Sequence, residues 1–186
     1  EEEGEEDVGE EELEEGRPAG ASVTASVDSC ETATLRPVRV IVSGAVADAD
    51  ADGDAVVLEV RDTGGKGLGL FAAADLATNT CLGEYTGEIL THADYVARYP
   101  REDAQYVLSA NSDYNIDAAD AATSSHLRYA NHSSTRANCF YAVERVRKQR
   151  AKRVVFYTAH AVCAGEELLF DYGEQYWLDR DVEPLD

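Results

Sequence analysis

Methionine is absent from this 186-residue chain, and cysteine and proline occur only four times each. Without a Met, Glu1 is not expected to be a native initiation site, so we expect the chain to be a piece of a longer protein. The cysteines, Cys30, Cys81, Cys139 and Cys163, lie far apart and form no C-x-x-C pair. This spacing argues against a zinc ribbon and a dense disulfide framework, and it favours reduced intracellular thiols.

Long apolar runs are missing as well. No stretch approaches the roughly eighteen residues of a membrane span, and the acidic start is unlike the basic start of a signal peptide. We therefore expect a soluble protein. A chain of this length with 44% hydrophobic residues can bury one core and hardly two, so one main domain is predicted.

Positive charge is scarce at the N-terminus. The formal net charge is −21, and residues 1–15 contain eleven acids and no base, which leaves about −10 for the rest of the chain. Such a run is typical of a solvated, disordered tail. It either keeps the protein in solution or contacts a basic partner, and the sequence does not distinguish the two.

One basic cluster interrupts the acidic chain at residues 145–153, where six of nine positions are Lys or Arg. A solvated hairpin explains it, and so does a patch that contacts the phosphates of nucleic acid. The cluster lacks the interleaved aromatic residues of a single-strand platform. The six bases are Arg145, Arg147, Lys148, Arg150, Lys152 and Arg153.

Short β-branched runs bounded by Gly, Asp and Asn predict a mostly-β domain with short helices. One helix is expected at residues 91–100, with Thr91 as its N-cap and Pro100 at its end. Strands are predicted at residues 36–42, 55–62, 104–110, 114–119, 138–146, 152–162 and 166–172, and a strand pair is predicted at 81–90, around Gly83 and Gly87.

The stretch GGKGLGLFA at residues 64–72 is rich in glycine but matches neither common nucleotide motif. The glycine after Gly65 and Gly67 comes at 69 rather than 70, and no Lys-Ser or Lys-Thr closes a phosphate loop. Gly67 and Gly69 allow the backbone to approach a ligand closely and to offer N–H groups to it. An ordinary turn remains the alternative.

A second stretch, RYANHSSTRANCFY at residues 128–141, gathers polar and aromatic side chains where a buried strand would need apolar ones. The Asn131–His132 pair offers donors and acceptors to a ligand rich in heteroatoms. His132 has no His or Cys partner at metal-binding spacing, so metal ligation is not expected. A purely structural hydrogen-bonding role is the alternative for either residue.

Together with GEYTGEIL at 83–90 and GEELLFDYGEQYW at 165–177, these stretches make four ordered motifs. In this order and at these separations the chain resembles the SET-domain protein lysine methyltransferases over residues 56–178. The resemblance implies a β-clip fold of small curved sheets with a knot-like C-terminal segment. Residues 1–20 are then an acidic disordered tail, 21–55 a linker with N-terminal flanking strands, and 179–186 a short C-terminal tail.

The resemblance also implies roles for individual residues. Tyr172 matches the catalytic tyrosine, and Tyr85 also belongs to the catalytic site. Tyr85, Phe170 and Tyr141 line the channel that admits the substrate lysine. Glu167 and Asp171 brace the site, and no metal is expected. The residues implied to hold S-adenosyl-L-methionine are Lys66, Gly67, Leu68, Gly69, Arg128, Tyr129, Asn131, His132 and Trp177.

The chain departs from many members of the family. Ser134 occupies a position where they have a zinc-binding Cys, and residues 173–186 contain no Cys, so that zinc site is not expected. Phe170 in place of Tyr favours the addition of two or three methyl groups, whereas Tyr141 acts in the opposite sense. We therefore leave the number of methyl groups open.

These implications predict an S-adenosylmethionine-dependent protein lysine methyltransferase whose substrate is a basic histone tail, in the nucleus. A non-histone substrate, a cytoplasmic location and an inactive SET-like module that binds a basic peptide are the alternatives. Nucleic-acid contact through the basic cluster is compatible with each of them.

Overall fold

The computed structural model describes residues 38–42, 55–101, 104–111, 114–145 and 152–178. The predicted tails at 1–20 and 179–186, and most of the 21–55 segment, lie outside these ranges. The described strands are β1 (Val38–Val42), β2 (Val56–Asp62), β3 (Leu68–Ala72), β4 (Cys81–Glu84), β5 (Glu88–Leu90), β6 (Val107–Asn111), β7 (Tyr114–Asp117), β8 (Asn131–His132), β9 (Cys139–Arg145), β10 (Lys152–Thr158) and β11 (Leu169–Phe170). The described helices are α1 (His92–Arg98), the 3₁₀-helix η1 (His126–Tyr129) and α2 (Glu174–Leu178).

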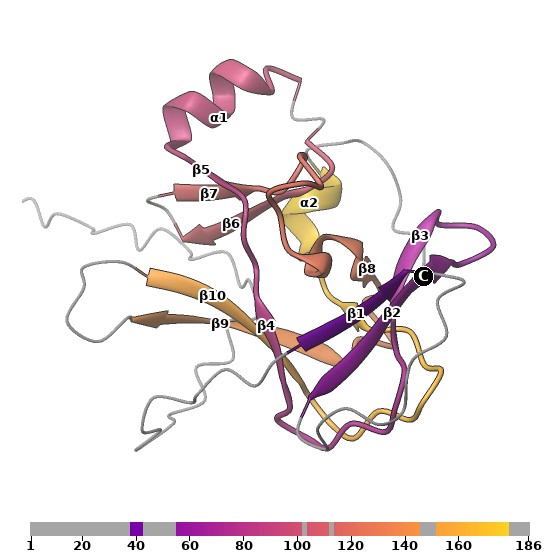
Figure 1. Ribbon diagram of the computed structural model, residues 1–186. Helices are drawn as coiled ribbons and strands as arrows, with labels where there is room; N and C mark the ends of the chain where they lie inside the picture. The colour runs from indigo at the N-terminus through magenta and orange to yellow at the C-terminus, as the bar shows by residue number, and fades with distance from the viewer. Residues whose placement is uncertain (1–37, 43–54, 102–103, 112–113, 146–151, 179–186) are drawn as a thin grey trace, which may run out of the picture.

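The prediction of a mostly-β fold with short helices is confirmed. The described strands form four small sheets with the orders β1-β2-β3, β4-β10-β9, β5-β7-β6 and β8-β11. Figure 1 shows β5, β7 and β6 beside α1 at one end and the β1-β2-β3 sheet at the other, with β9 and β10 on a third side. Within the described ranges no helix has the length and apolarity needed to cross a membrane.

The core is centred on β10, which lies between β4 and β9 in its sheet. Val154, Val155, Phe156 and Thr158 of this strand are completely buried. A strand covered on both faces needs a continuous apolar run rather than an alternating one, and KRVVFYT supplies it. Leu58 of β2 joins the same core from another sheet.

Helix α1 is confirmed close to its predicted bounds, and the side chain of Thr91 accepts a hydrogen bond from the Asp94 N–H as the N-cap. No residue of α1 is buried, and the polar contacts of Arg98 join the helix to the sheet. Arg98 contacts Glu88 at 2.7 Å and the buried carboxylate of Asp117 at 3.0 Å. These contacts join α1 to β5 and β7.

Gly87, just before β5, allows that strand to lie against the end of β7. A Cβ atom at this position would be 2.2 Å from the carbonyl oxygen of Asp117. No side chain fits at that distance, so only glycine permits the approach.

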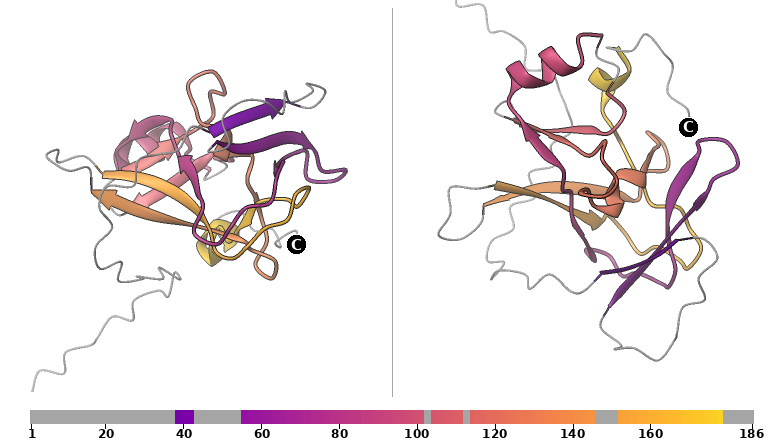
Figure 2. Two further views of the ribbon diagram at one scale, coloured as in Figure 1. Left: turned by 60° about the horizontal axis from the view of Figure 1, so that its bottom comes forward. Right: turned by 45° about the horizontal axis from the view of Figure 1, so that its top comes forward.

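The strand predicted at 166–172 is much shorter in the structure, where it is the two-residue β11. Its ladder partner β8 is equally short, because the chain turns away after His132. Side-chain hydrogen bonds continue the contact: Asn138 donates to the carbonyl of Glu167 and accepts from the N–H of Leu169, both at 2.8 Å. Figure 2 shows the C-terminal segment, in yellow, beside the orange segment that contains β8, the strand with which β11 pairs. The knot-like arrangement itself stays a prediction.

Candidate active site

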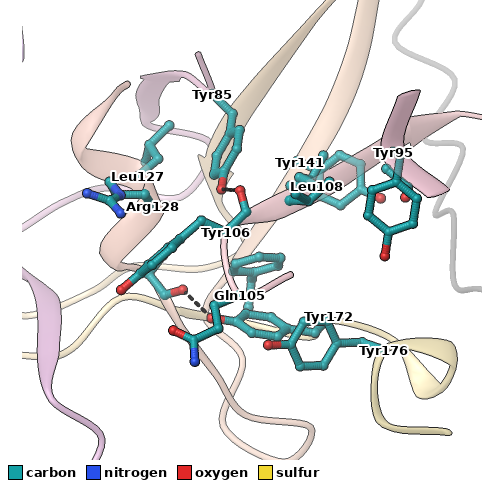
Figure 3. A pocket seen from close by; sticks show the side chains of 14 residues that line it. Tyr85, Tyr95, Gln105, Tyr106, Leu108, Leu127, Arg128, Tyr141, Tyr172 and Tyr176 are labelled. Atoms are coloured by element: carbon teal, nitrogen blue, oxygen red, sulfur yellow. Dashed lines mark hydrogen bonds between the residues drawn. The ribbon is translucent and has the colours of Figure 1, made fainter. Parts of the chain in front are cut away.

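A cavity of about 260 Å³ lies where β6, β9, β11 and the two α-helices meet. Its walls are mainly aromatic, and six tyrosines face it from five different parts of the chain (Figure 3). The lining residues are Tyr85, Tyr95, Gln105, Tyr106, Val107, Leu108, Ser109, Leu127, Arg128, Ala130, Tyr141, Phe170, Tyr172 and Tyr176.

The floor of the cavity is formed by rings that pack on Phe156 of the core. The Phe170 ring meets Phe156 edge-on with centroids 4.9 Å apart, and Tyr85 stacks on Phe156 at 5.9 Å. Tyr141 lies 5.7 Å from the same ring and stays 38% exposed at the mouth. The predicted channel residues Tyr85, Tyr141 and Phe170 are thus brought together.

Tyr172 follows β11 and is held at both ends. Its hydroxyl donates to the carbonyl of Ala130 at 2.9 Å, and its N–H donates to Nδ1 of His132 at 3.1 Å. Burial, reinforced by Tyr176 and Tyr85, raises the pKa of the phenol far above its usual value. Tyr172 is therefore neutral at physiological pH and is not a general base.

Tyr85 is fixed in the same manner, because its hydroxyl donates to the carbonyl of Tyr106 at 3.0 Å. Burial is also the main cause that raises its pKa. Since each phenol donates its single hydrogen to a main-chain carbonyl, the lone pairs of the two oxygens remain for a ligand in the cavity. The cavity therefore offers hydrogen-bond acceptors on aromatic walls.

A second group of predicted residues meets on the other side of His132. Lys66 Nζ donates to the carbonyl of His132 at 3.0 Å. The Asn131 amide donates to the carbonyl of Leu68 at 3.2 Å and to Glu167 at 2.8 Å. These contacts bring the glycine-rich turn before β3 against β8, although the two segments are more than sixty residues apart. We call residues 66–69 with Asn131 and His132 the cradle.

The two glycines of the cradle serve different purposes. Gly67 has a φ of +79°, which side-chain-bearing residues adopt at a cost, and no atom lies within 4 Å of where its Cβ would be. The backbone is thus open above Gly67. At Gly69 a Cβ would lie 2.5 Å from Thr63 Cγ2 and 2.6 Å from Glu167 Oε1, so any larger residue would displace these two side chains.

Trp177 of α2 covers the cradle from the side. Its ring lies 4.8 Å from His132 and nearly parallel to Tyr172, at 9° and 6.2 Å. The indole Nε1 is buried and has no hydrogen-bond acceptor among the described residues. An open backbone, the cation of Lys66 and an unsatisfied N–H beside aromatic rings fit a cofactor that combines a carboxylate with a purine, as S-adenosylmethionine does.

Two residues predicted with the cofactor group lie elsewhere in the structure. Arg128 lines the aromatic cavity, with its guanidinium 4.0 Å above the ring of Tyr106. Tyr129 is partly buried against the hydrophobic core. Asp171 is half-exposed beside His132, at 3.7 Å.

The basic cluster is only partly within the described residues, since Arg147, Lys148 and Arg150 fall outside them. Arg145 and Lys152 face each other in the β9–β10 register. Arg153 pairs with Glu144 at 2.7 Å. Nucleic-acid contact stays a prediction.

Sequence reasoning missed several residues of the cavity, namely Tyr95, Gln105, Tyr106, Ser109 and Tyr176. Residues 105–109 all line the cavity, so the alternation of side chains along the predicted 104–110 strand could not have singled out Tyr106. No local signal indicated that Tyr95 of α1 and Tyr176 of α2 approach the same cavity, since about eighty residues separate them.

Comparison with known proteins gives a consistent result. The family model described as SET domain matches residues 67–173. The histone-lysine N-methyltransferase SETD2 of Homo sapiens is 40% identical over 120 residues, which are 62% of this chain and 4% of that protein. The histone-lysine N-methyltransferase CLF of Oryza sativa subsp. japonica is 34% identical over 117 residues, 61% of this chain and 12% of that protein. The chain thus spans only a small part of the length of these relatives.

Proposed function

Because this chain belongs to the SET-domain family, we propose that it is an S-adenosylmethionine-dependent protein lysine N-methyltransferase. The observation that carries the proposal is the position of Tyr172 between two sites. Its ring lies 4.7 Å from Phe170 in the aromatic cavity and 5.2 Å from His132 in the cradle. A lysine in the cavity and a cofactor in the cradle would meet at Tyr172.

Lysine must lose a proton before it can accept a methyl group, because its pKa in water is about 10.4. A cavity of tyrosine and phenylalanine rings disfavours the ammonium form by desolvation and so exposes the nitrogen lone pair. The phenol oxygens of Tyr85 and Tyr172, whose hydrogens are donated to carbonyls, would accept the remaining amine N–H groups and orient the nitrogen.

S-adenosylmethionine, which SET methyltransferases use in general, supplies the electrophilic methyl group and a positive sulfonium. The cradle would bind its carboxylate through Lys66 and its purine beside Trp177. The protein's own contribution is then position and exclusion of water. Alignment of two reactants in this manner is worth roughly 7 to 11 kcal/mol in favourable systems.

We infer that the substrate is a histone lysine and that the protein acts in the nucleus. Two observations support this: the relatives named above are called histone-lysine N-methyltransferases, and the chain carries a net charge of −21, which suits a basic tail. A non-histone lysine would use the same cavity. Phe170 leaves room beside the amine for further methyl groups, whereas Tyr141 acts in the opposite sense. The number of methyl groups added is therefore a result of the experiment below.

The experiment is transfer of labelled methyl from S-adenosylmethionine to core histones and to total cell protein, with the product read by mass spectrometry. We compare the parent protein with Tyr172→Phe, which keeps the ring and removes the hydroxyl. Loss of that hydroxyl is expected to lower the rate by roughly 100-fold, the usual effect of losing one preorganised polar contact. Label on a histone lysine names the site and the number of methyl groups.

Tyr157→Phe is the matched control, because the Tyr157 hydroxyl bonds Glu144 and does not line the cavity. We expect its activity to stay within about twofold of the parent, as for a surface change remote from the chemistry. A parent protein that binds the cofactor in calorimetry but labels nothing would replace this proposal with the peptide-binding module. Full activity in Tyr172→Phe would remove Tyr172 from the mechanism.

A further inference from the structure

Arg128 is the only residue with a formal charge among the fourteen that line the aromatic cavity. Its guanidinium lies 4.0 Å above the Tyr106 ring and 5.2 Å above the Tyr129 ring. One terminal nitrogen donates to the carbonyl of Ala119 at 3.0 Å. The Nε atom is buried and has no acceptor among the described residues.

No carboxylate in the described part of the chain forms an ion pair with Arg128. Asp117, at the end of β7, and Asp120, just after it, form their hydrogen bonds with other residues. Asp117 is held by Arg98 and Tyr99, at 3.0 and 2.8 Å. Asp120 is exposed and accepts hydrogen bonds from Ala122 and Thr123. Arg128 and Asp120 attract each other, but Asp120 is exposed and solvent screens the attraction, so the positive charge of Arg128 is only partly offset.

The charge also reaches the inside of the cavity. Tyr85, which also lines the cavity, has a pKa that burial raises, and the charge of Arg128 is the largest influence in the opposite direction. Figure 3 shows Tyr106 between Arg128 and Tyr172 in that view. A lysine nitrogen in the cavity would therefore contact the Tyr106 ring, and the guanidinium of Arg128 already occupies the other face of that ring.

On the basis of the proposed function, we propose that Arg128 is an electrostatic positioning residue that favours the neutral form of the substrate lysine amine. Two effects have the same sign. The guanidinium repels an ammonium directly, and it occupies one face of the Tyr106 ring, which weakens the attraction of the other face for a second cation. Both stabilise the form of lysine that can accept a methyl group.

The size of the effect follows from the geometry. An amine against the free face of Tyr106 would lie about 8 Å from the guanidinium, which at an effective dielectric constant of about 20 lowers the amine pKa by roughly 1.5 units. Arg128 is only partly buried, so solvent screening reduces this to about one unit. Removing the charge therefore moves the amine pKa in the complex upward by about one unit.

The test is the pH dependence of the single-turnover rate at saturating peptide, which reports groups in the enzyme–substrate complex. In Arg128→Gln the ascending limb of the pH–rate profile is expected to move about one unit to higher pH. At pH values below this limb the rate then falls about tenfold, and it recovers in alkali. In Arg128→Lys, which keeps the charge, the limb is expected to stay within about 0.3 units of the parent. Arg128→Met, with a stem that still packs on Tyr106, replaces the Gln variant if that variant does not fold.

A structural anchor would give a different result. If Arg128 only ties Ala119 to η1, the neutral variants lose the same fraction of activity at every pH and the limb does not move. That outcome overturns the inference and leaves the methyltransferase intact. A parent protein without methyl transfer at any pH overturns the proposed function itself, so the two failures are distinguishable.

Discussion

Replacing Asn138 by Ala should detach the C-terminal segment that carries Phe170 and Tyr172. Asn138 is 7% exposed, and its side chain bridges two main-chain groups of that segment. It donates to the carbonyl of Glu167 and accepts from the N–H of Leu169, both at 2.8 Å. Ala leaves both groups without a side-chain partner in a place that water does not easily reach.

The expected cost follows from those two groups. Each buried polar group left unsatisfied costs about 1 to 3 kcal/mol, so Asn138→Ala should lower the free energy of unfolding by about 2 to 6 kcal/mol. A single domain is usually stable by only about 5 to 15 kcal/mol, so the loss is a large fraction of the total. The amide of Leu169 should also exchange with solvent much faster, because Asn138 is its acceptor.

Urea unfolding gives the free energy, and hydrogen exchange read by mass spectrometry or NMR gives the protection of Leu169. Thr135→Ala, an exposed position in the same loop, is the control and should change stability by less than about 0.5 kcal/mol. A loss below about 1 kcal/mol in Asn138→Ala, with Leu169 still protected, would show that the two hydrogen bonds do not hold the segment.

Three further predictions concern other parts of the molecule. Burial would raise the pKa of Asp117, but hydrogen bonds from Ala119, Tyr99 and Arg98 outweigh it and hold this pKa below its usual value. The contribution of Asp117 to stability is therefore full above about pH 4 and is lost as the pH falls through the lowered pKa. Thermal unfolding from pH 7 to 2 should show a decrease of the melting temperature in acid that is absent in Asp117→Asn. Gly87→Ala should yield little folded protein, because its Cβ would be 2.2 Å from a carbonyl oxygen; normal yield and melting temperature would contradict this packing. Burial raises the pKa of the Cys139 thiol to about 12, whereas Cys163 is exposed. Iodoacetamide at pH 8 should therefore alkylate Cys163 before Cys139, as read by peptide mapping. Equal rates of alkylation would contradict the burial of Cys139.

Local elements were predictable because their signals lie within a few residues of one another. Thr91 predicted the start of α1, since an N-cap needs only a side-chain oxygen next to the first free N–H groups. The apolar run around Phe156 predicted β10 in the same way. The length of β11 was predicted wrongly, because strand length depends on the partner, and β8 offers only two residues.

The sequence by itself determined the strand-rich class, the position of α1 and the four motifs that place the chain in its family, since each depends on neighbouring residues or on their order. Only the tertiary structure decided that Tyr95, Tyr106 and Tyr176 share one cavity and that Arg128 lies on its wall rather than in the cradle. These residues come together across separations of roughly ten to eighty positions. Contacts between residues so far apart in the sequence depend on the packing of whole sheets and on the hydrogen bonds of buried groups. No short window of sequence contains this information.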